Sequence, residues 1–244
     1  MHRFYIAPED WNPEALTLTG SQAHHASNVL RLARGSRAVV FNGVGREITA
    51  EVTGHAGAAL QLRKLHEAQT LPLRCRITLG QAIPKGKNMD LIVQKAVEIG
   101  AAEIAPIVSD RTVVRLDEED AAQKQVKWQT VAIEAAKQCG QNWLPIVRKP
   151  VTLAQFFADS SRSDLQLIGS LQSDAQHLKK LLAERDERPA SVLMLIGPEG
   201  DFTPAELNLA RTNGCRPITL GPIILRVETA AIYCLSVLSY ELLA

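Results

Sequence analysis

The sequence lacks the features that mark secreted, membrane-spanning and metal-binding proteins. Its 244 residues include only four cysteines, none of them in a C-x-x-C pair, so neither a disulfide framework nor a zinc site is expected. No signal-like apolar segment follows the first residues, and the longest apolar stretch, residues 230–243, is too short to span a bilayer. His24 and His25 are adjacent and cannot readily share one face of a helix or strand. We therefore expect a cytoplasmic protein with no membrane segment and no metal site.

The sequence also lacks an excess of charge of one sign. Its 27 basic and 26 acidic side chains leave a formal net charge of +1, which argues neither for nor against RNA as a partner. The positive excess lies in residues 71–150, which carry 12 basic and 9 acidic side chains, and five of the six histidines fall within the first 70 residues. An RNA-facing surface, if present, is therefore expected in the first two thirds of the chain.

Two sequence patterns meet near residue 70. Before it, short alternating apolar runs and turns are typical of a small antiparallel β-barrel with one helix. After a linker at residues 70–73, strands and helices alternate, which predicts an α/β domain with a parallel sheet. We expect domains at residues 1–70 and 71–244. The predicted helices include residues 21–32, 88–100, 126–139, 153–158 and 177–183, and the acidic run 117–120 is expected to open an exposed helix.

Residues 191–231 contain two predicted strands that each end in a Gly-Pro loop. Thr203, followed by Pro204 and then by Glu206, predicts a capping box for the helix after the first loop. In a parallel sheet such loops gather at one edge and expose backbone groups to a ligand. Glu199 and Asp201 would repel a pyrophosphate, and neither loop matches a nucleotide-binding pattern, so a neutral or cationic small molecule fits better. The alternative is that both loops are ordinary connections.

These loops resemble the paired motifs of the RsmE family in the SPOUT superfamily. Residues 196–203 read Ile-Gly-Pro-Glu-Gly-Asp-Phe-Thr, and residues 220–231 read Leu-Gly-Pro-Ile-Ile-Leu-Arg-Val-Glu-Thr-Ala-Ala. The sequence departs from the family pattern at Asp201, where a second glycine is usual, and at Val227, where threonine is common. Further matches lie at residues 3–4, 23–25, 81–87, 94–100 and 109–112, so the resemblance covers nearly the whole chain.

The resemblance implies both an activity and a fold. Proteins of this family use S-adenosylmethionine to methylate N3 of a uridine in the 16S ribosomal RNA of the small ribosomal subunit. The implied fold is a PUA-like RNA-binding β-barrel followed by a SPOUT-type parallel sheet with a carboxyl-terminal trefoil knot. Two other readings stay open: a non-catalytic RNA-binding or ribosome-assembly factor with the same fold, or a methyltransferase acting on a different RNA.

A homodimer is also implied by the resemblance. It fits the apolar last helix, whose apolar side chains exceed what one core face needs. These side chains belong to Ala230, Ala231, Leu235, Leu238 and Leu242.

Methylation of uracil N3 requires a group that accepts its proton or stabilises negative charge on the flanking carbonyl oxygens. Arg226 cannot act as a base but can stabilise the developing anion. Glu228 can take the proton or orient Arg226, and the alternative is a structural ion pair between the two. Glu199 is a weaker candidate base. The two loops are expected to hold the cofactor through Ile196, Gly197, Pro198, Glu199, Gly200, Leu220, Gly221, Ile224 and Leu225.

Basic residues outside the loops are candidates for RNA contacts. Lys85 and Lys87 precede Asn88 in a segment that superficially suggests a Walker A loop, but the spacing is wrong by one. Arg31 and Arg34 lie near the end of a predicted helix, where they equally suit the negative end of its dipole. For any single cation a solvated surface role is the default. The candidate set is Arg3, His24, Arg31, Arg34, Lys85, Lys87 and Arg111.

Overall fold

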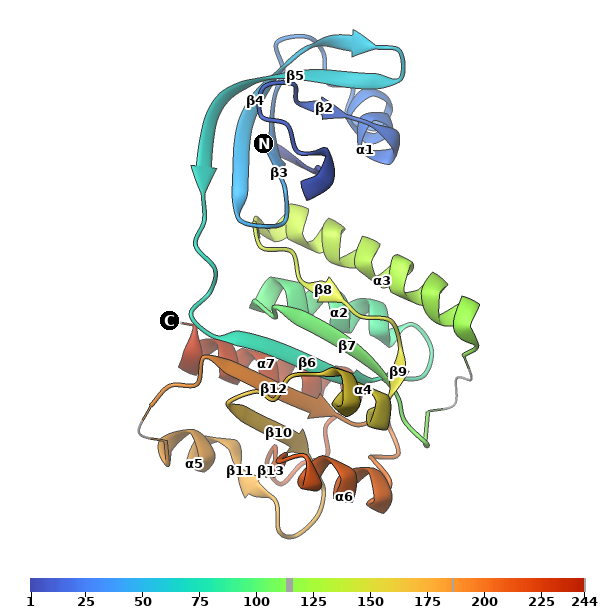
Figure 1. The fold of residues 1–244 in the computed structure, drawn as a ribbon, viewed down its shortest axis with the longest axis vertical. Coiled ribbons are helices and arrows are strands. Elements are labelled where there is room, and N and C mark those ends of the chain that lie inside the picture. The colour runs from blue at the N-terminus through green and yellow to red at the C-terminus, as the bar shows by residue number, and fades with distance from the viewer. Residues whose placement is uncertain (113–115, 186, 244) are drawn as a thin grey trace. The chain divides into compact units, whose positions relative to one another are not determined.

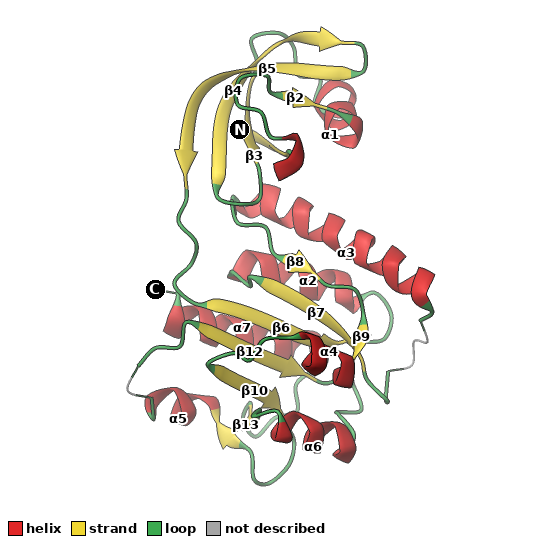
Figure 2. Ribbon diagram, viewed as in Figure 1, coloured by secondary structure: helices red, strands yellow, loops and turns green. Residues whose placement is uncertain are grey.

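The computed structural model describes residues 1–112, 116–185 and 187–243. Its backbone contacts divide the chain into two compact units (Figures 1 and 2). One unit comprises residues 1–72 and 133–144, and the other comprises residues 73–132 and 145–244. Within the described ranges, no helix has both the length and the apolar composition needed to cross a membrane.

The first unit is built on a five-stranded sheet with the strand order β1-β3-β4-β5-β2. Neighbouring strands are antiparallel except β1 and β3, which run parallel, so the prediction of a wholly antiparallel barrel is wrong at this pairing. The β4–β5 pairing continues through two register shifts, which lets both strands extend beyond the predicted runs. The strands are β1 (His2–Tyr5), β2 (Thr17–Leu18), β3 (Arg37–Phe41), β4 (Arg46–Ala56) and β5 (Ala59–Gln69).

The helix predicted at residues 21–32 forms only in part. The helix α1 (Gly20–His24) continues directly into a π-helical turn, η2 (His25–Val29). Arg31 then adopts a left-handed backbone conformation with a φ of 52°, which a helix cannot contain. Arg31 and Arg34 therefore follow the helix rather than lie in its last turn. A separate short 3-10 helix, η1 (Pro8–Asp10), follows β1.

A single long helix, α3 (Glu118–Cys139), replaces two predicted segments. Its first turn is acidic, and Asp117 Oδ1 accepts a hydrogen bond from Asp120 N at 2.8 Å. The prediction that the acidic run opens a helix is confirmed. The prediction of a separate helix from residue 126 is wrong, because residues 121–125 contain neither glycine nor proline and continue the helix.

The second unit contains an eight-stranded sheet in which every pairing is parallel, as the alternating pattern predicted. Its order is β11-β13-β10-β12-β6-β7-β8, and β9 also pairs with β7. The strands are β6 (Arg76–Ala82), β7 (Glu103–Val108), β8 (Ile146–Val147), β9 (Val151–Thr152), β10 (Leu165–Gly169), β11 (Gln176–His177), β12 (Ser191–Ile196) and β13 (Arg216–Thr219).

Helices cover this sheet. The helices α2 (Asn88–Ile99) and α7 (Val227–Leu242) pack against each other, and α7 also contacts β6 and β12. Figure 1 shows both behind the strands, whereas α4 (Leu153–Asp159) lies in front of them. The core that contains α4 also contains residues of α6 (Pro204–Thr212) and β12. The short helix α5 (Leu178–Ala183) follows β11.

The apolar side chains of α7 are buried by this packing. Ala230, Ala231, Leu235, Leu238 and Leu242 are each at most 9% exposed. The prediction that they exceed the needs of one core is wrong, because both the sheet and α2 cover this helix. These five residues therefore give no support for a dimer.

Candidate functional site

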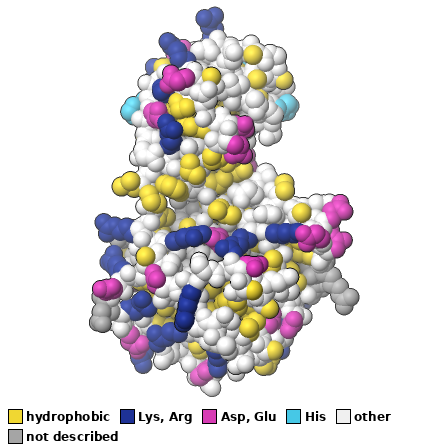
Figure 3. All heavy atoms as spheres, in the orientation of Figure 1, with side chains coloured by type: hydrophobic (Ala, Val, Ile, Leu, Met, Phe, Trp, Pro, Cys, Tyr) yellow, Lys and Arg dark blue, Asp and Glu magenta, His cyan; other side chains and the backbone are white. Residues whose placement is uncertain are grey.

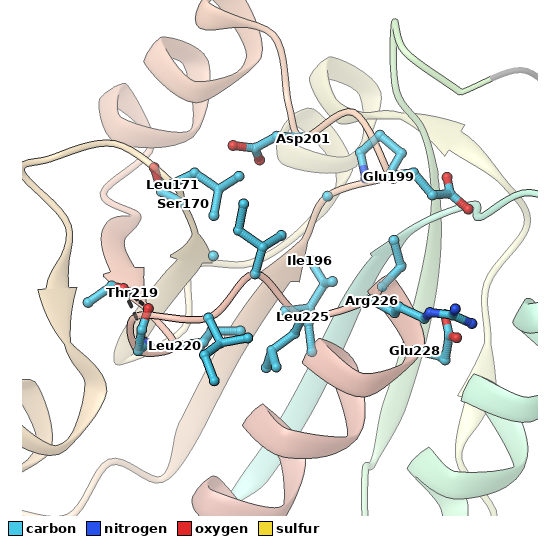
Figure 4. A pocket seen from close by; sticks show the side chains of 18 of the residues that line it. Ser170, Leu171, Ile196, Glu199, Asp201, Thr219, Leu220, Leu225, Arg226 and Glu228 are labelled. Carbon is cyan, nitrogen blue, oxygen red and sulfur yellow. Dashed lines mark hydrogen bonds between the residues drawn. The ribbon is translucent and has the colours of Figure 1, made fainter.

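A cavity of about 490 Å³ opens at the carboxyl ends of β10, β12 and β13 (Figure 4). Its walls are the loops that follow these strands, together with the first turn of α7 and Asn88 at the start of α2. Every residue predicted to hold the cofactor lines it, except Gly200. The lining residues include Asn88, Ser170, Leu171, Ile196, Gly197, Glu199, Asp201, Leu220, Gly221, Leu225, Arg226 and Glu228.

The loop after β12 forms a tight turn. Asp201 N donates to Pro198 O at 2.9 Å, and Asp201 adopts a left-handed conformation with a φ of 60°. A Cβ atom on Gly197 would lie 3.1 Å from Asp201 Oδ1 and 3.2 Å from Phe202 N. Glycine at position 197 therefore lets this turn close without displacing its neighbours.

Two side chains anchor this turn to neighbouring loops. Arg111 Nη1 donates to Gly200 O, and Glu199 Oε1 accepts a hydrogen bond from Lys85 N at 2.9 Å. Arg111, a candidate for RNA contact, and Glu199, a candidate base, both hold the loop in this structure.

The predicted capping box of α6 is confirmed. Thr203 Oγ1 accepts from Glu206 N at 3.3 Å, and Thr203 N donates to the Glu206 carboxylate at 2.8 Å. Glu206 is only 7% exposed, and its carboxylate also accepts from Ser109 Oγ at 3.2 Å and from Asp110 N at 3.0 Å. One buried carboxylate therefore joins α6 to the loop after β7, which carries Arg111.

The loop after β13 is more open. Gly221 has a φ of 115°, and a Cβ there would meet no atom within 4 Å, so backbone conformation rather than crowding favours glycine. Thr219 Oγ1 accepts from Gly221 N at 3.3 Å. Leu225 is half-buried, whereas Ile224, which is also expected to hold the cofactor, is 77% exposed.

A third loop, which the sequence reasoning missed, contributes to the cavity. Gly169, Ser170 and Leu171 end or follow β10, and β10 lies between β12 and β13 in the sheet. The available signal was a Gly-Ser pair directly after an apolar strand. That signal indicates a turn, but only the strand order places the turn between the two Gly-Pro loops.

Arg226 and Glu228 lie close together at one end of the cavity (Figure 4). Arg226 is the exposed N-cap residue of α7, and Glu228 is half-buried in the first turn, where the helix dipole favours a carboxylate. Glu228 Oε2 accepts a hydrogen bond from Asn88 Nδ2 at 3.2 Å. Across the described ranges no ion pair of 4.0 Å or less joins Arg226 to Glu228. Asn88, for which the sequence suggested no role at the site, therefore holds this carboxylate.

Arg3 is engaged within its own unit. Its guanidinium pairs with Glu47, donates to Asn142 Oδ1 at 2.6 Å and lies 5.0 Å from the centroid of the Phe41 ring. Only 14% of the side chain is exposed. Arg3 is therefore a candidate for RNA contact whose guanidinium already has partners within the protein.

The other candidates for RNA contact are exposed. Figure 3 shows Lys and Arg side chains on this face of both units, with acidic side chains among them. The exposed candidates are His24, Arg31 and Arg34 in the first unit and Lys85, Lys87 and Arg111 in the second.

The cysteines offer no reactive group at the cavity. Burial raises the pKa of the Cys75 thiol to about 11, and it raises the pKa of the Cys215 and Cys234 thiols to about 12. These thiols therefore stay protonated at neutral pH. In the described part of the chain, no group of three or more His, Cys, Asp or Glu side chains could hold a metal ion.

Matches to two protein families show that this chain is an RNA methyltransferase. Residues 71–239 match the RNA methyltransferase domain family, and residues 18–59 match the RNA methyltransferase PUA domain family. The first match covers more than half of the chain and includes all three loops of the cavity.

Individual relatives narrow this class. A ribosomal RNA small subunit methyltransferase E from Synechocystis is 33% identical, over 94% of this chain and 74% of the relative. One with the same name from Bacillus subtilis is 32% identical, over 99% of this chain and 97% of the relative. The chain therefore belongs to the ribosomal RNA small subunit methyltransferase E family.

Two solved structures with bound S-adenosylmethionine share the fold. A ribosomal RNA small subunit methyltransferase E from Neisseria gonorrhoeae is 30% identical, with a TM-score of 0.85 over 98% of this chain and 97% of that one. A methyltransferase from Legionella pneumophila is 34% identical, with a TM-score of 0.88 over 98% of this chain and 96% of that one.

Proposed function

We propose that this protein transfers a methyl group from S-adenosylmethionine to N3 of a uridine in the 16S ribosomal RNA of the small subunit. The observation that carries the proposal is the cavity formed by three loops at the carboxyl ends of adjacent parallel strands, in a chain of this family. The names of the relatives support ribosomal RNA of the small subunit as the substrate. The choice of uridine N3 is supported by the resemblance of residues 196–203 and 220–231 to the RsmE motifs.

The residues around the cavity fit S-adenosylmethionine. Its volume of about 490 Å³ lies in the range of small-molecule sites. Ile196, Leu220 and Leu225 offer apolar surface for an adenine ring. Gly197 and Gly221 bring backbone groups to the cavity wall, where they can bind the edges of the adenine and the ribose. The acidic side chains of the wall suit a cationic ligand and oppose a phosphate-bearing one.

Bound S-adenosylmethionine supplies an electrophilic methyl group. The side chains of the protein must then hold the uracil in line with that methyl and remove the N3 proton. We assign the removal of this proton to Glu228, which is supported by the position of its carboxylate at the cavity. Among the described residues, the hydrogen bond that this carboxylate accepts comes from the neutral Asn88 amide. Arg226, exposed at the same end, stabilises the negative charge that develops on the uracil oxygens.

The proposal extends to the organisation of the chain. We assign RNA binding to residues 1–70 and catalysis to residues 71–244, acting on ribosomal RNA in the cytoplasm. The match of residues 18–59 to a PUA domain family supports the first assignment. We further propose that α7 threads the loops after β12 and β13 as a trefoil knot, which is supported by its packing against β6 and β12.

We also propose a homodimer, on different grounds from those given by the sequence. The proposal is supported by exposed side chains with apolar surface on the two helices that pack together, which a second copy of the chain would cover. They are Leu91 on α2, at 40% exposed, and Tyr233 and Tyr240 on α7, at 40% and 81%.

The substitution Glu228→Gln tests the assignment of the base. It is expected to lower turnover by about 100-fold or more, because general bases contribute about 10²–10⁴-fold. Binding of S-adenosylmethionine should persist with at most the few-fold weakening that loss of one cavity carboxylate brings, because the amide oxygen can still accept the bond from Asn88. Transfer of labelled methyl groups to purified small subunits measures turnover, and isothermal titration measures binding. Glu241→Gln, at an exposed position of the same helix, is the matched control.

Different outcomes separate the alternatives. Full turnover in Glu228→Gln would remove this residue as the base, and loss of cofactor binding would make it a structural clasp. A wild-type chain that binds no S-adenosylmethionine would favour the non-catalytic ribosome-assembly factor. Methylation confined to another RNA would favour a methyltransferase that acts on a different RNA.

A further inference from the structure

The cavity has an excess of negative charge. Three carboxylates line it, those of Glu199, Asp201 and Glu228, against the single guanidinium of Arg226. Glu199 and Glu228 are both hydrogen-bonded to the segment that starts α2, through Lys85 N and Asn88 Nδ2. Asp201 has no such contact with that segment in the described part of the chain.

Asp201 holds its carboxylate apart from Arg226 and Glu228 (Figure 4). Its Oδ1 accepts a hydrogen bond from Phe202 N at 2.8 Å, and Phe202 is only 2% exposed, so the side chain is fixed to a buried neighbour. Asp201 Oδ2 has no hydrogen-bond partner among the residues that the structure describes. One carboxylate oxygen is thus held and the other remains available to a ligand.

The turn itself does not require an aspartate at position 201. With a φ of 60°, the backbone is in the left-handed region, which glycine adopts without strain and aspartate adopts less readily. A glycine would therefore form this turn at least as well. An aspartate that the turn does not require, and that contributes a charge to a ligand cavity, points to a role for the charge.

We propose that Asp201 makes the cavity discriminate between the methyl donor and its demethylated product. The inference rests on the proposed function. In the reaction the bond from sulfur to methyl breaks as the bond from uracil N3 to methyl forms, and the N3 proton leaves to a base. The sulfonium thereby becomes a neutral thioether. A carboxylate near the cavity attracts the positively charged donor and loses that attraction when the product forms.

This discrimination is expected as a difference in affinity between the donor and its product. S-adenosylhomocysteine keeps the adenosine and the amino-acid part of the donor, so apolar and backbone contacts hold both ligands alike. Charge is the main property that differs between them. For a partly exposed carboxylate we expect the donor to gain about three- to tenfold in affinity over the product, and added salt to reduce this preference.

Isothermal titration of the full chain with each ligand tests the proposal, at low and high salt. Asp201→Asn removes the charge but keeps an acceptor for Phe202 N, and asparagine tolerates the left-handed region. Asp201→Asn is expected to lower the affinity for S-adenosylmethionine by about three- to tenfold. It should change the affinity for S-adenosylhomocysteine by less than about twofold. Asp201→Gly, which also relieves the backbone, should give the same result. Asp159→Asn, at the exposed end of α4, is the control for net charge and should alter neither affinity.

Three results would overturn the inference. Equal weakening of both ligands in Asp201→Asn and Asp201→Gly would make Asp201 a structural residue of the turn. Unchanged affinities in both variants, with a wild type that binds both ligands, would remove any role for the charge while leaving the proposed function intact. A wild type that binds neither ligand would overturn the proposed function and this inference together.

Discussion

Replacing Glu206 by alanine is expected to destabilise the second unit far more than replacing Gln155, its counterpart in another capping box. Each is the third residue of a helix whose N-cap is a threonine, Thr203 for α6 and Thr152 for α4. The two capping boxes differ in the burial and charge of this third residue. Gln155 is exposed, and among the described residues its side-chain oxygen accepts hydrogen bonds only from Thr152.

The Glu206 carboxylate, in contrast, has several donors at a site that is 7% exposed. Thr203 N lies at 2.8 Å, Thr203 Oγ1 at 3.0 Å, Asp110 N at 3.0 Å and Ser109 Oγ at 3.2 Å. Hydrogen bonds to a charged group contribute about 1.5–3 kcal/mol each, but neighbouring bonds are not additive. We expect Glu206→Ala to cost about 3 kcal/mol in the free energy of unfolding, and Gln155→Ala about 0.5 kcal/mol.

In a chain of this length, about 3 kcal/mol corresponds to a fall in Tm of about 6–12 °C, and about 0.5 kcal/mol to a fall of about 1–2 °C. Urea unfolding, followed by the fluorescence of the buried Trp128 in the second unit, gives the free energies. Glu206→Ala should also weaken S-adenosylmethionine binding, because the loop it holds carries Arg111, which anchors Gly200. Equal losses of unfolding free energy in the two variants would refute the reasoning. The capping box alone, and not the burial and charge of the Glu206 carboxylate, would then account for the effect.

Two further predictions concern the surface. Joint substitution of Lys85 and Lys87 by glutamine should weaken RNA binding and flatten its salt dependence, by about 0.7–0.9 in the log–log slope for each phosphate that the two side chains no longer neutralise. Titration of small-subunit RNA at several salt concentrations measures this slope, and an unchanged slope would remove both lysines from the interface. Native protein should react with a thiol reagent at the exposed Cys139, while the three thiols with raised pKa react only after unfolding. Mass mapping of the labelled cysteines checks this, and early labelling of Cys215 or Cys234 would contradict it.

Several features of the second unit could be predicted because their signals are local. Thr203, Pro204 and Glu206 lie within four positions and specify a capping box by themselves. The Gly-Pro pairs that follow two apolar strands mark both loops, and Gly197, Pro198 and Gly221 line the cavity. Alternation of strands and helices predicts a parallel sheet without any knowledge of strand order.

The features that could not be predicted depend on contacts between distant segments. The loop at residues 169–171 reaches the cavity because β10 pairs with both β12 and β13, and no pattern near residue 169 encodes these pairings. The apolar residues of α7 are as apolar in a core as in a dimer interface, so composition alone could not decide between them. Only the observed packing of α7 against the sheet and α2 does.

The roles of charged side chains depend on distant partners in the same way. Arg3 and Arg111 carry the positive charge that is typical of RNA contacts. However, Arg3 forms an ion pair with Glu47, and Arg111 donates a hydrogen bond to the carbonyl oxygen of Gly200. A substitution at Arg111 would therefore disturb the cavity loop as well as any RNA contact, and its effect on turnover could not be assigned to either. Lys85 and Lys87 are better probes, because their exposed side chains can be changed while the hydrogen bond from Lys85 N to Glu199 is a backbone contact that the substitution keeps.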